Sequence, residues 1–192
     1  MIDNKTRVQI YTAPTVEPVS VAEFKTFARL DHSDEDAALT LMLQAVREAA
    51  EKYLGRALLE QTIYYTMDKW EGSEIELPYP PLLTVEGVYT RESDGTWTEY
   101  DSGNYFVGTE GIPGSIVLIV GAVAPDAPEV DTAGYQIRYT AGYGDAAADV
   151  PAAIRQAILG WATVAYATRA VTIDPPPEVR SMLSLYRVER LK

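Results

Sequence analysis

The sequence predicts an α+β protein with a mainly helical core and one inserted antiparallel β unit. Three observations support this fold class. Apolar residues recur at helical spacing before residue 55, and the same spacing returns after residue 150. Between these regions, over about residues 61–140, apolar and polar residues alternate with a period of two and are interrupted by glycines and prolines.

The length of 192 residues is enough for one sizeable core or two small ones. We expect three segments along the chain. Residues 1–60 form an extended N-terminal arm followed by helices of the core, and residues 61–149 form the inserted acidic β unit. Residues 150–192 then supply the C-terminal helices and the tail that complete the core.

Two helices are expected before the β unit. The first covers about residues 21–29, where Ser20 and Glu23 stand in capping-box spacing. The second covers residues 34–54, opens with acidic residues that suit a helix N-terminus and ends at Gly55, which can adopt the left-handed conformation. Its apolar stripe is made of Leu39, Met42, Val46, Ala49 and Tyr53.

The middle of the chain reads as five to seven short antiparallel strands. In QTIYYTM, which starts at Gln61, apolar and polar side chains alternate as a half-buried strand requires. Further on, the pair Asp94-Gly95 separates two strand-like runs and predicts a hairpin. The glycine-rich ends of the later runs fit the turns between short strands.

Helical spacing returns over residues 151–169 and again over residues 177–186. We expect Asp149 to be the acidic N-cap of the first of these helices. Pro151 follows it closely, and proline is favoured in the first turn of a helix. A second face of small residues runs along this helix and indicates packing on two sides. Its members are Ala153, Ala157, Gly160 and Val164.

Charge is distributed unevenly. The net charge is −12, and residues 61–149 hold 15 acidic side chains against only Lys69, Arg91 and Arg138. Such a surface repels phosphates, which argues against sequence-specific DNA binding through the β unit. The stretch from 177 to 192 is mildly basic, with four basic residues against two acidic ones.

Residues that would support catalysis or a cofactor are scarce. There is no cysteine, and His32 is the only histidine, which disfavours thiolate metal sites, His-rich metal sites and hydrolase triads. Gly142 and Gly144 precede a helix, but the nearby Asp145 and Asp149 would repel a phosphate, so we interpret this stretch as a hinge. We therefore expect no enzyme activity, no catalytic or metal-binding residues and no cofactor.

The tyrosines leave an alternative function open. Nine of the 13 tyrosines lie between Tyr64 and Tyr143, which suits either ordinary sheet packing or a glycan-binding face. A tail-associated glycan-binding β-domain is therefore the alternative function. The N-terminus has no basic patch followed by an apolar run, so we expect no signal peptide. Arg155 and Gln156 interrupt the helix at 151–169, and its uninterrupted apolar run is too short to span a bilayer.

The chain from about Pro18 to Leu191 resembles the head-tail connector (adaptor, or head completion) family of tailed phages, which also occurs in phage-like gene transfer agents. The resemblance rests on short motifs in a fixed order. These are LDHSDED from residue 30, GRAL from 55, LPYPPL from 77, AGYGD from 141, VPAAI from 150 and YRV from 186.

The resemblance implies a structural virion protein that forms a ring, expected as a dodecamer, beneath the portal protein. The ring joins the DNA-filled head to the tail, meets the next tail or stopper protein, and continues a channel through which double-stranded DNA passes without specific binding. Such a protein is assembled in the bacterial cytoplasm and resides in the neck of the particle. Acidic residues of the β unit that line the channel would repel DNA and let it slide.

Two groups of contact residues follow as hypotheses. The C-terminal end, with alternating apolar and basic side chains, is expected to dock on the portal through Tyr186, Arg187, Val188, Arg190 and Leu191. The inter-subunit seam is expected to combine Leu41 and Ala45 with the small-residue face given by Ala153, Ala157, Gly160 and Val164.

Overall fold

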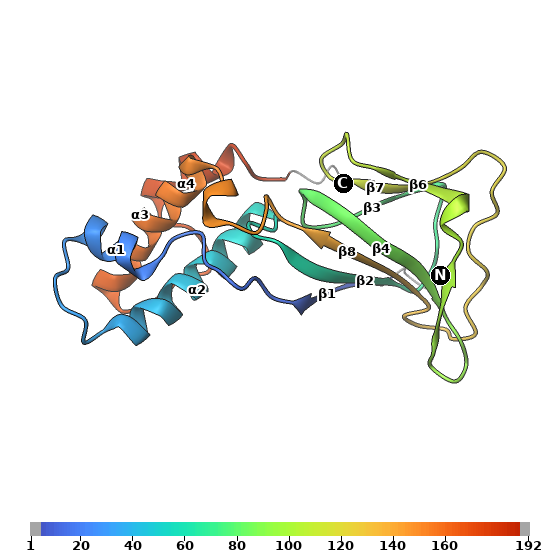
Figure 1. The fold of residues 1–192 in the computed structure, drawn as a ribbon, viewed down its shortest axis with the longest axis horizontal. Helices are drawn as coiled ribbons and strands as arrows, with labels where there is room; N and C mark the ends of the chain where they lie inside the picture. The colour runs from blue at the N-terminus through green and yellow to red at the C-terminus, as the bar shows by residue number, and fades with distance from the viewer. Residues whose placement is uncertain (1–4, 189–192) are drawn as a thin grey trace. The chain divides into compact units, whose positions relative to one another are not determined.

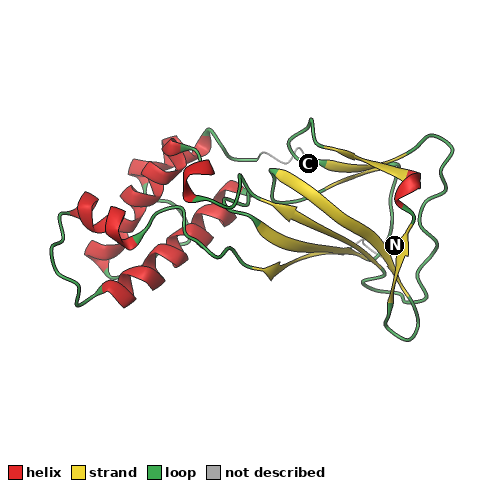
Figure 2. Ribbon diagram, in the orientation of Figure 1, coloured by secondary structure: helices red, strands yellow, loops and turns green. Residues whose placement is uncertain are grey.

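The computed structural model describes residues 5–188 and divides them into two compact units. The β unit contains the described residues up to Ala13 together with Glu60–Gly142. The helical unit contains Pro14–Leu59 and the described residues from Tyr143 onward. Each unit is thus built from two separate stretches of chain, and Figures 1 and 2 show helices and strands segregated between them.

Four helices make up the helical unit: α1 (Val21–Ala28), α2 (Asp36–Leu54), α3 (Ala152–Thr168) and α4 (Pro177–Ser184). The capping box is confirmed, because the Ser20 hydroxyl accepts a hydrogen bond from the Glu23 amide at 3.2 Å and Glu23 bonds back to the Ser20 amide at 2.8 Å. Gly55 ends α2 in the left-handed conformation with φ 65°, as its position in the sequence predicted. The helix boundaries differ from the expected ones by one or two residues.

The core of the helical unit lies where α2 and α3 pack together, with α1 and α4 added to it. Trp161 of α3 is the largest side chain that is fully buried there. The apolar stripes expected for α2 and α3 face this core through Leu39, Val46, Ile154, Ile158, Trp161 and Ala165. Hydrophobic burial along these stripes therefore holds the unit together.

Eight strands form two antiparallel sheets in the β unit. The larger sheet has the order β1-β2-β8-β4-β5, with β1 (Thr6–Thr12), β2 (Gln61–Met67), β8 (Tyr135–Ala141), β4 (Leu82–Arg91) and β5 (Trp97–Tyr100). The smaller sheet has the order β3-β7-β6, with β3 (Glu74–Glu76), β7 (Ser115–Leu118) and β6 (Tyr105–Gly108). The hairpin expected at Asp94-Gly95 is confirmed, since it connects β4 to β5.

The expectation of a mainly helical core is wrong. About 32% of the structure is helical and 26% is strand, and the strands form two sheets rather than an appendage. The β unit buries apolar side chains of its own from both sheets, namely Ile63, Ile75, Val88, Ile116, Ile137 and Tyr139. The β unit therefore has a core of its own, separate from the helical core. The spacing of apolar residues in the sequence did not reveal this second core.

Two local expectations also need correction. The stretch described as an extended arm contains β1, which pairs with β2 along most of its length. Asp149 does not cap α3, because the N-cap of α3 is Pro151. The Asp149 carboxylate instead accepts a hydrogen bond from the Ala146 amide at 3.0 Å and closes a short 3-10 turn, η2 (Ala147–Asp149).

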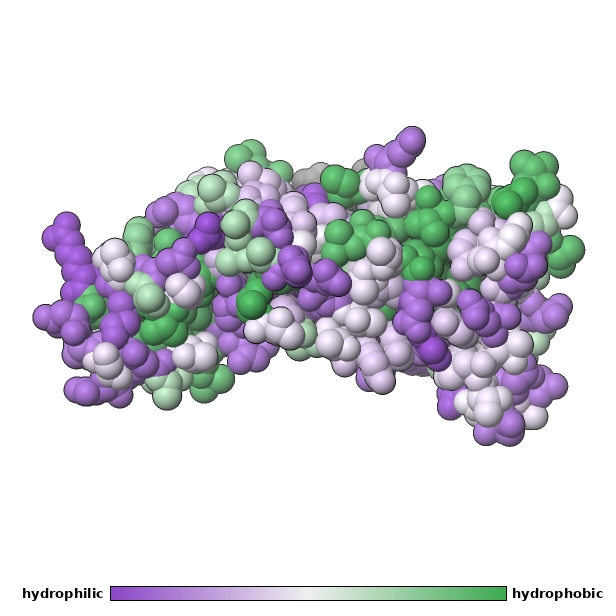
Figure 3. Space-filling view, viewed as in Figure 1, coloured by the Kyte–Doolittle hydropathy of each residue, from purple (hydrophilic) through white to green (hydrophobic). Residues whose placement is uncertain are grey.

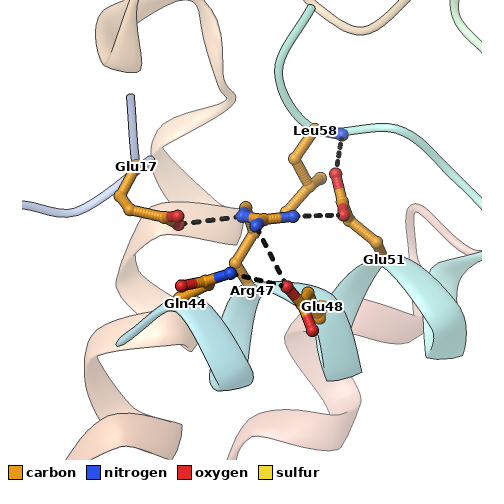
Figure 4. Close-up of polar contacts among 6 residues, drawn as sticks. All are labelled: Glu17, Gln44, Arg47, Glu48, Glu51 and Leu58. Atoms are coloured by element: carbon orange, nitrogen blue, oxygen red, sulfur yellow. Dashed lines mark hydrogen bonds and ion pairs between the residues drawn. The ribbon is translucent and has the colours of Figure 1, made fainter. Parts of the chain in front are cut away.

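A buried ion-pair cluster fixes the segment before α1 and the segment after α2 to the middle of α2 (Figure 4). The guanidinium of Arg47 lies 2.9 Å from Glu17 and 2.8 Å from Glu51, and its side chain is only 4% exposed. Glu51 also accepts a hydrogen bond from the Leu58 amide at 2.9 Å. Burial opposes the charge of Arg47, but Glu51 and Glu17 outweigh it and raise the Arg47 pKa.

Candidate assembly surfaces

The end of the described chain is anchored to the C-terminal end of α2. The Val188 amide donates to the Leu54 carbonyl at 2.9 Å, and Arg56 donates to the carbonyl of Tyr186. The Arg187 guanidinium lies over the Tyr53 ring, 5.1 Å from its centroid. Cation–π contact and backbone hydrogen bonds therefore hold this segment against the helical unit.

The expected portal-docking residues are only partly placed by the structure. Tyr186, Arg187 and Val188 belong to the anchored segment, whereas Arg190 and Leu191 lie outside the described residues. Just before the anchor, Leu185 is 83% exposed at the end of α4. The sequence showed that the end of the chain is mildly basic. Nothing in the sequence indicated that Tyr186, Arg187 and Val188 pack on the end of α2.

An apolar groove runs between the N-terminal half of α2 and the end of α3. Its volume is about 340 Å³, and Leu41 and Ala45 lie along it, as do Met42, Ala165, Tyr166 and Val171. Leu41 is 68% exposed and adjoins the other apolar side chains of the groove, so it forms part of a contiguous apolar surface. The groove is therefore a candidate contact surface for another protein chain.

Charged and polar side chains fix one rim of the groove. The Tyr166 hydroxyl donates to Glu35 at 2.6 Å, and Arg169 pairs with the same carboxylate at 2.7 Å. The Arg169 guanidinium also lies 4.7 Å from the centroid of the Tyr166 ring. The hydrogen bond from Tyr166 and the contacts with Arg169 lower the Glu35 pKa, so the rim is held by an ionised carboxylate.

The small-residue face of α3 does not contribute to this groove. Ala157 is fully buried, and a Cβ added at Gly160 would lie 2.8 Å from Val179 of α4. Ala153 and Val164 are half-buried. The structure thus places Leu41 and Ala45 together on an accessible surface, whereas Gly160 serves the close approach of α4 to α3.

The acidic residues of the β unit lie almost entirely on its surface. Of the 15 between residues 61 and 149, only Asp68 is buried. Asp68 pairs with Arg7 of β1 at 2.7 Å and accepts a hydrogen bond from the Ala133 amide at 2.8 Å. The contact with Arg7, followed by the hydrogen bond from Ala133, lowers the Asp68 pKa. The ion pair with Arg7 also links β1 to the segment after β2.

Apolar side chains are exposed over the small sheet and the loop that follows β7. Phe106 of β6 is 54% exposed, and Val120 is completely exposed. Together with Ile119 and Gly121 they border a shallow hollow. Figure 3 shows hydrophobic residues gathered over the region that contains β6 and β7. Sequence patterning missed this surface because the same residues fit a buried strand equally well.

Metal-binding clusters and membrane-spanning helices were sought among residues 5–188. No group of three or more His, Cys, Asp or Glu side chains among residues 5–188 is arranged to hold a metal ion. Within the same range, no helix combines the length and the apolar character needed to cross a membrane.

Comparison with known proteins identifies relatives over the whole described chain. The model of the head completion protein family matches residues 17–188. No curated protein sequence matches the chain. Among solved structures, a chain in the neck of an empty gene transfer agent particle, computed with C6 symmetry, has a TM-score of 0.82 and 25% sequence identity, and the similarity covers 97% of both chains.

Two further structures give the same result. A chain in the virion of a native gene transfer agent particle has a TM-score of 0.81 at 25% identity, covering 96% of this chain and 97% of that one. A chain in the neck of a native particle, computed with C12 symmetry, has a TM-score of 0.80 at 25% identity and covers 97% of both chains. The likeness therefore extends over the helical unit and the β unit alike.

Proposed function

The chain belongs to the head completion protein family and is a structural head-tail connector of the particle neck, and from this premise we propose that it forms a ring between the portal and the tail. The ring joins the DNA-filled head to the next tail or stopper protein and continues the DNA channel. The observation that carries this proposal is the likeness to neck chains along 97% of the sequence. The neck computed with C12 symmetry supports a ring of twelve copies.

The role we propose is assembly rather than catalysis. Membership in a family of structural neck proteins supports it. An assembly protein needs surfaces that contact different partners at the same time, and the described chain offers an exposed apolar groove, an anchored C-terminal segment and an apolar surface on the small sheet.

We assign the portal contact to the C-terminal segment. The anchoring of Tyr186, Arg187 and Val188 on α2 supports this assignment, because it sets the point from which Arg190 and Leu191 continue. A segment whose root is fixed loses less conformational entropy when it binds than a free peptide does. The mildly basic character of this end then suits an acidic or polar cleft on the portal.

We assign the inter-subunit seam to the groove that contains Leu41 and Ala45, with a neighbouring copy of the chain as its occupant. The 68% exposure of Leu41 supports this assignment, because an apolar side chain of that exposure gains free energy when a neighbour covers it. Ala157 and Gly160, which are packed inside the helical unit, are left out of the seam.

We further propose that the acidic β unit contributes to the DNA channel. Between residues 61 and 149, 14 of the 15 acidic residues are accessible, against three basic residues, of which Arg138 lies 4.0 Å from the centroid of the Tyr89 ring. The stretch that contains β1 adds two basic residues to the unit, Lys5 and Arg7. A wall of this charge repels the DNA backbone and prevents the duplex from binding as it passes. Double-stranded DNA would therefore pass through the ring without binding specifically to it.

A truncation separates docking from folding. A chain that ends at Val188 keeps every anchor described above, so it should fold, while particles that carry it should accumulate as DNA-filled heads without tails. The matched control is Arg180→Ala, which changes one basic residue of α4 outside the C-terminal segment and should leave particles complete. If the truncated chain still yields complete, transfer-competent particles, the assignment of the portal contact to the C-terminus is wrong.

A further inference from the structure

β1 is an edge strand with an unusually accessible surface. It is the terminal strand of the larger sheet, and all seven of its residues, Thr6–Thr12, are exposed. Val8 and Ile10, which lie on the same face as the buried Ile63, are 40% and 49% exposed. One backbone edge of β1 pairs with β2, and the described sheet has no strand beyond its other edge.

The sequence of β1 lacks most of the devices that keep edge strands from pairing with other chains. Monomeric proteins place proline or inward-pointing charges on such strands, or shorten them. β1 has neither proline nor an acidic residue, and its only charge, Arg7, is bonded to Asp68. A bulge follows Ile10, so Thr6–Ile10 remain regular. An open regular edge of this kind is a template for another strand.

The opposite end of the same sheet carries the complementary charge. The terminal strand there is β5 (Trp97–Tyr100), and the stretch from 92 to 101 that contains it has four acidic residues and no basic one. The stretch from 5 to 13 that contains β1 has two basic residues, Lys5 and Arg7, and no acidic one. Arg7 remains 46% exposed, so guanidinium donors other than the one bonded to Asp68 stay accessible.

We propose that β1 of one copy pairs with β5 of the next, so that the larger sheet continues from subunit to subunit around the ring. The two edges differ, so the contact is head-to-tail, which is the type of interface that closes into a ring. Edge pairing satisfies backbone groups and covers Val8 and Ile10, and the opposite charges of Arg7 and Glu99 favour this partner over β1 pairing with itself. The inference rests on the proposed ring.

The absence of cysteine from the sequence makes this pairing directly testable by disulfide cross-linking. Gln9 and Glu99 lie on the same face of the sheet: Gln9 is opposite Tyr64, Glu99 is opposite Tyr89, and the Arg138 guanidinium lies over both tyrosine rings. Because neighbouring strands of the larger sheet alternate in direction, β1 and β5 run the same way, and the pairing around a ring is parallel. Neighbouring strands of a sheet lie about 4.7–4.9 Å apart, within the Cα separation that a disulfide spans.

The experiment uses particles assembled with the variant chain. Gln9→Cys is combined with Glu99→Cys, and in a second variant with Trp97→Cys, so that two registers on this face are sampled. After oxidation, a denaturing gel without reductant should show a ladder of multimers and loss of most of the monomer band in at least one variant. Reductant should restore the monomer.

The control variant combines Gln9→Cys with Glu74→Cys, which places the second thiol on β3, the terminal strand of the smaller sheet. It should remain monomeric, as should Gln9→Cys alone. If the chain is present in the neck but both β5 variants remain monomeric, or if only the β3 control cross-links, the pairing of β1 with β5 is wrong and the connector function stands. If the chain is absent from purified particles, the proposed ring and this pairing fail together.

Discussion

The Nη1 atom of Arg47 lies 2.8 Å from Oε2 of Glu51, one turn further along α2, and neither side chain is more than 5% exposed. Glu17, in the segment before α1, places a second carboxylate 2.9 Å from the same guanidinium, and the Leu58 amide donates to the other oxygen of Glu51. Two stretches of chain that flank the helices are thereby tied to one buried charge. We expect this cluster to set how the chain enters and leaves the helical unit.

Replacing Arg47 with Met should lower the free energy of unfolding by about 3–5 kcal/mol, because it leaves the buried Glu51 carboxylate without its partner. Chemical denaturation followed by circular dichroism measures this change. The control is Gln44→Ala, whose side chain makes one exposed hydrogen bond to Glu48 and should cost at most about 0.5 kcal/mol. Equal effects of the two substitutions would contradict a structural role for the cluster.

Gly160 should be required for the packing of α4 on α3. A Cβ at this position would lie 2.8 Å from Cγ1 of Val179, so Gly160→Ala should destabilise the protein by about 1–3 kcal/mol, although alanine favours a helix more than glycine does. In the Val179→Ala background the same substitution should cost nothing or stabilise. A double-mutant cycle measures the coupling, and additive effects would show that the two residues do not meet.

Acid should lower the free energy of unfolding, because it protonates carboxylates whose pKa is lowered in the folded state. Glu35, bonded to Tyr166 and Arg169, contributes stability that is fully present above the ordinary glutamate pKa of 4.5. This contribution is lost as the pH falls from there through the lower pKa of the folded state. Thermal unfolding at a series of pH values should therefore show a steeper loss below pH 4.5 for the natural chain than for Glu35→Gln. If the stability of the two proteins falls equally with pH, Glu35 does not contribute to the acid sensitivity.

Leu41→Asp should leave the monomer folded but prevent its assembly, because the side chain is 68% exposed and lies on the groove assigned to the seam. The variant should show the circular dichroism spectrum of the natural chain and should be missing from the necks of purified particles. Thr40→Asp, at an exposed neighbouring position outside the groove lining, is the matched control. Normal incorporation of Leu41→Asp would place the seam elsewhere.

Reversing the charge of channel-lining acidic residues should slow DNA release, because lysines in their place attract phosphates. Two groups of exposed acids are suited to the test. One group is Glu71, Glu74 and Glu76, and the other is Glu110, Asp126 and Asp131. Substitution of one group at a time with Lys, compared with Gln at the same positions, separates attraction from lost repulsion. Ejection kinetics that are unchanged for both groups would refute a channel lined by these residues.

The parts of the fold that depend on neighbouring residues were predictable from the sequence. The Ser20 capping box, the end of α2 at Gly55 and the hairpin at Asp94-Gly95 each follow from a few adjacent side chains, and all three are confirmed. β1 was read as part of an extended arm because Val8 and Ile10 alone make too short an apolar alternation to show that the stretch pairs in a sheet. Its place in the sheet depends on pairing with residues 50 or more positions away.

The candidate surfaces were predictable only in part, because they combine residues that are distant from one another in the sequence. Leu41 stood out because it lies off the buried stripe of α2, but the groove beside it requires the end of α3, which sequence spacing does not place. The small-residue face of α3 was correctly expected to be packed on a second side. Whether another subunit or α4 supplies that packing depends on tertiary contacts, and for Gly160 the neighbour is Val179 of α4.

The measurement that tests the connector role most directly is to mix the purified chain with rings of the portal protein from the same particle. Sedimentation and negative-stain images should show a second ring stacked on the portal, with a stoichiometry that matches it. Portal rings that sediment unchanged, with a correctly folded 192-residue chain left free, would contradict the account.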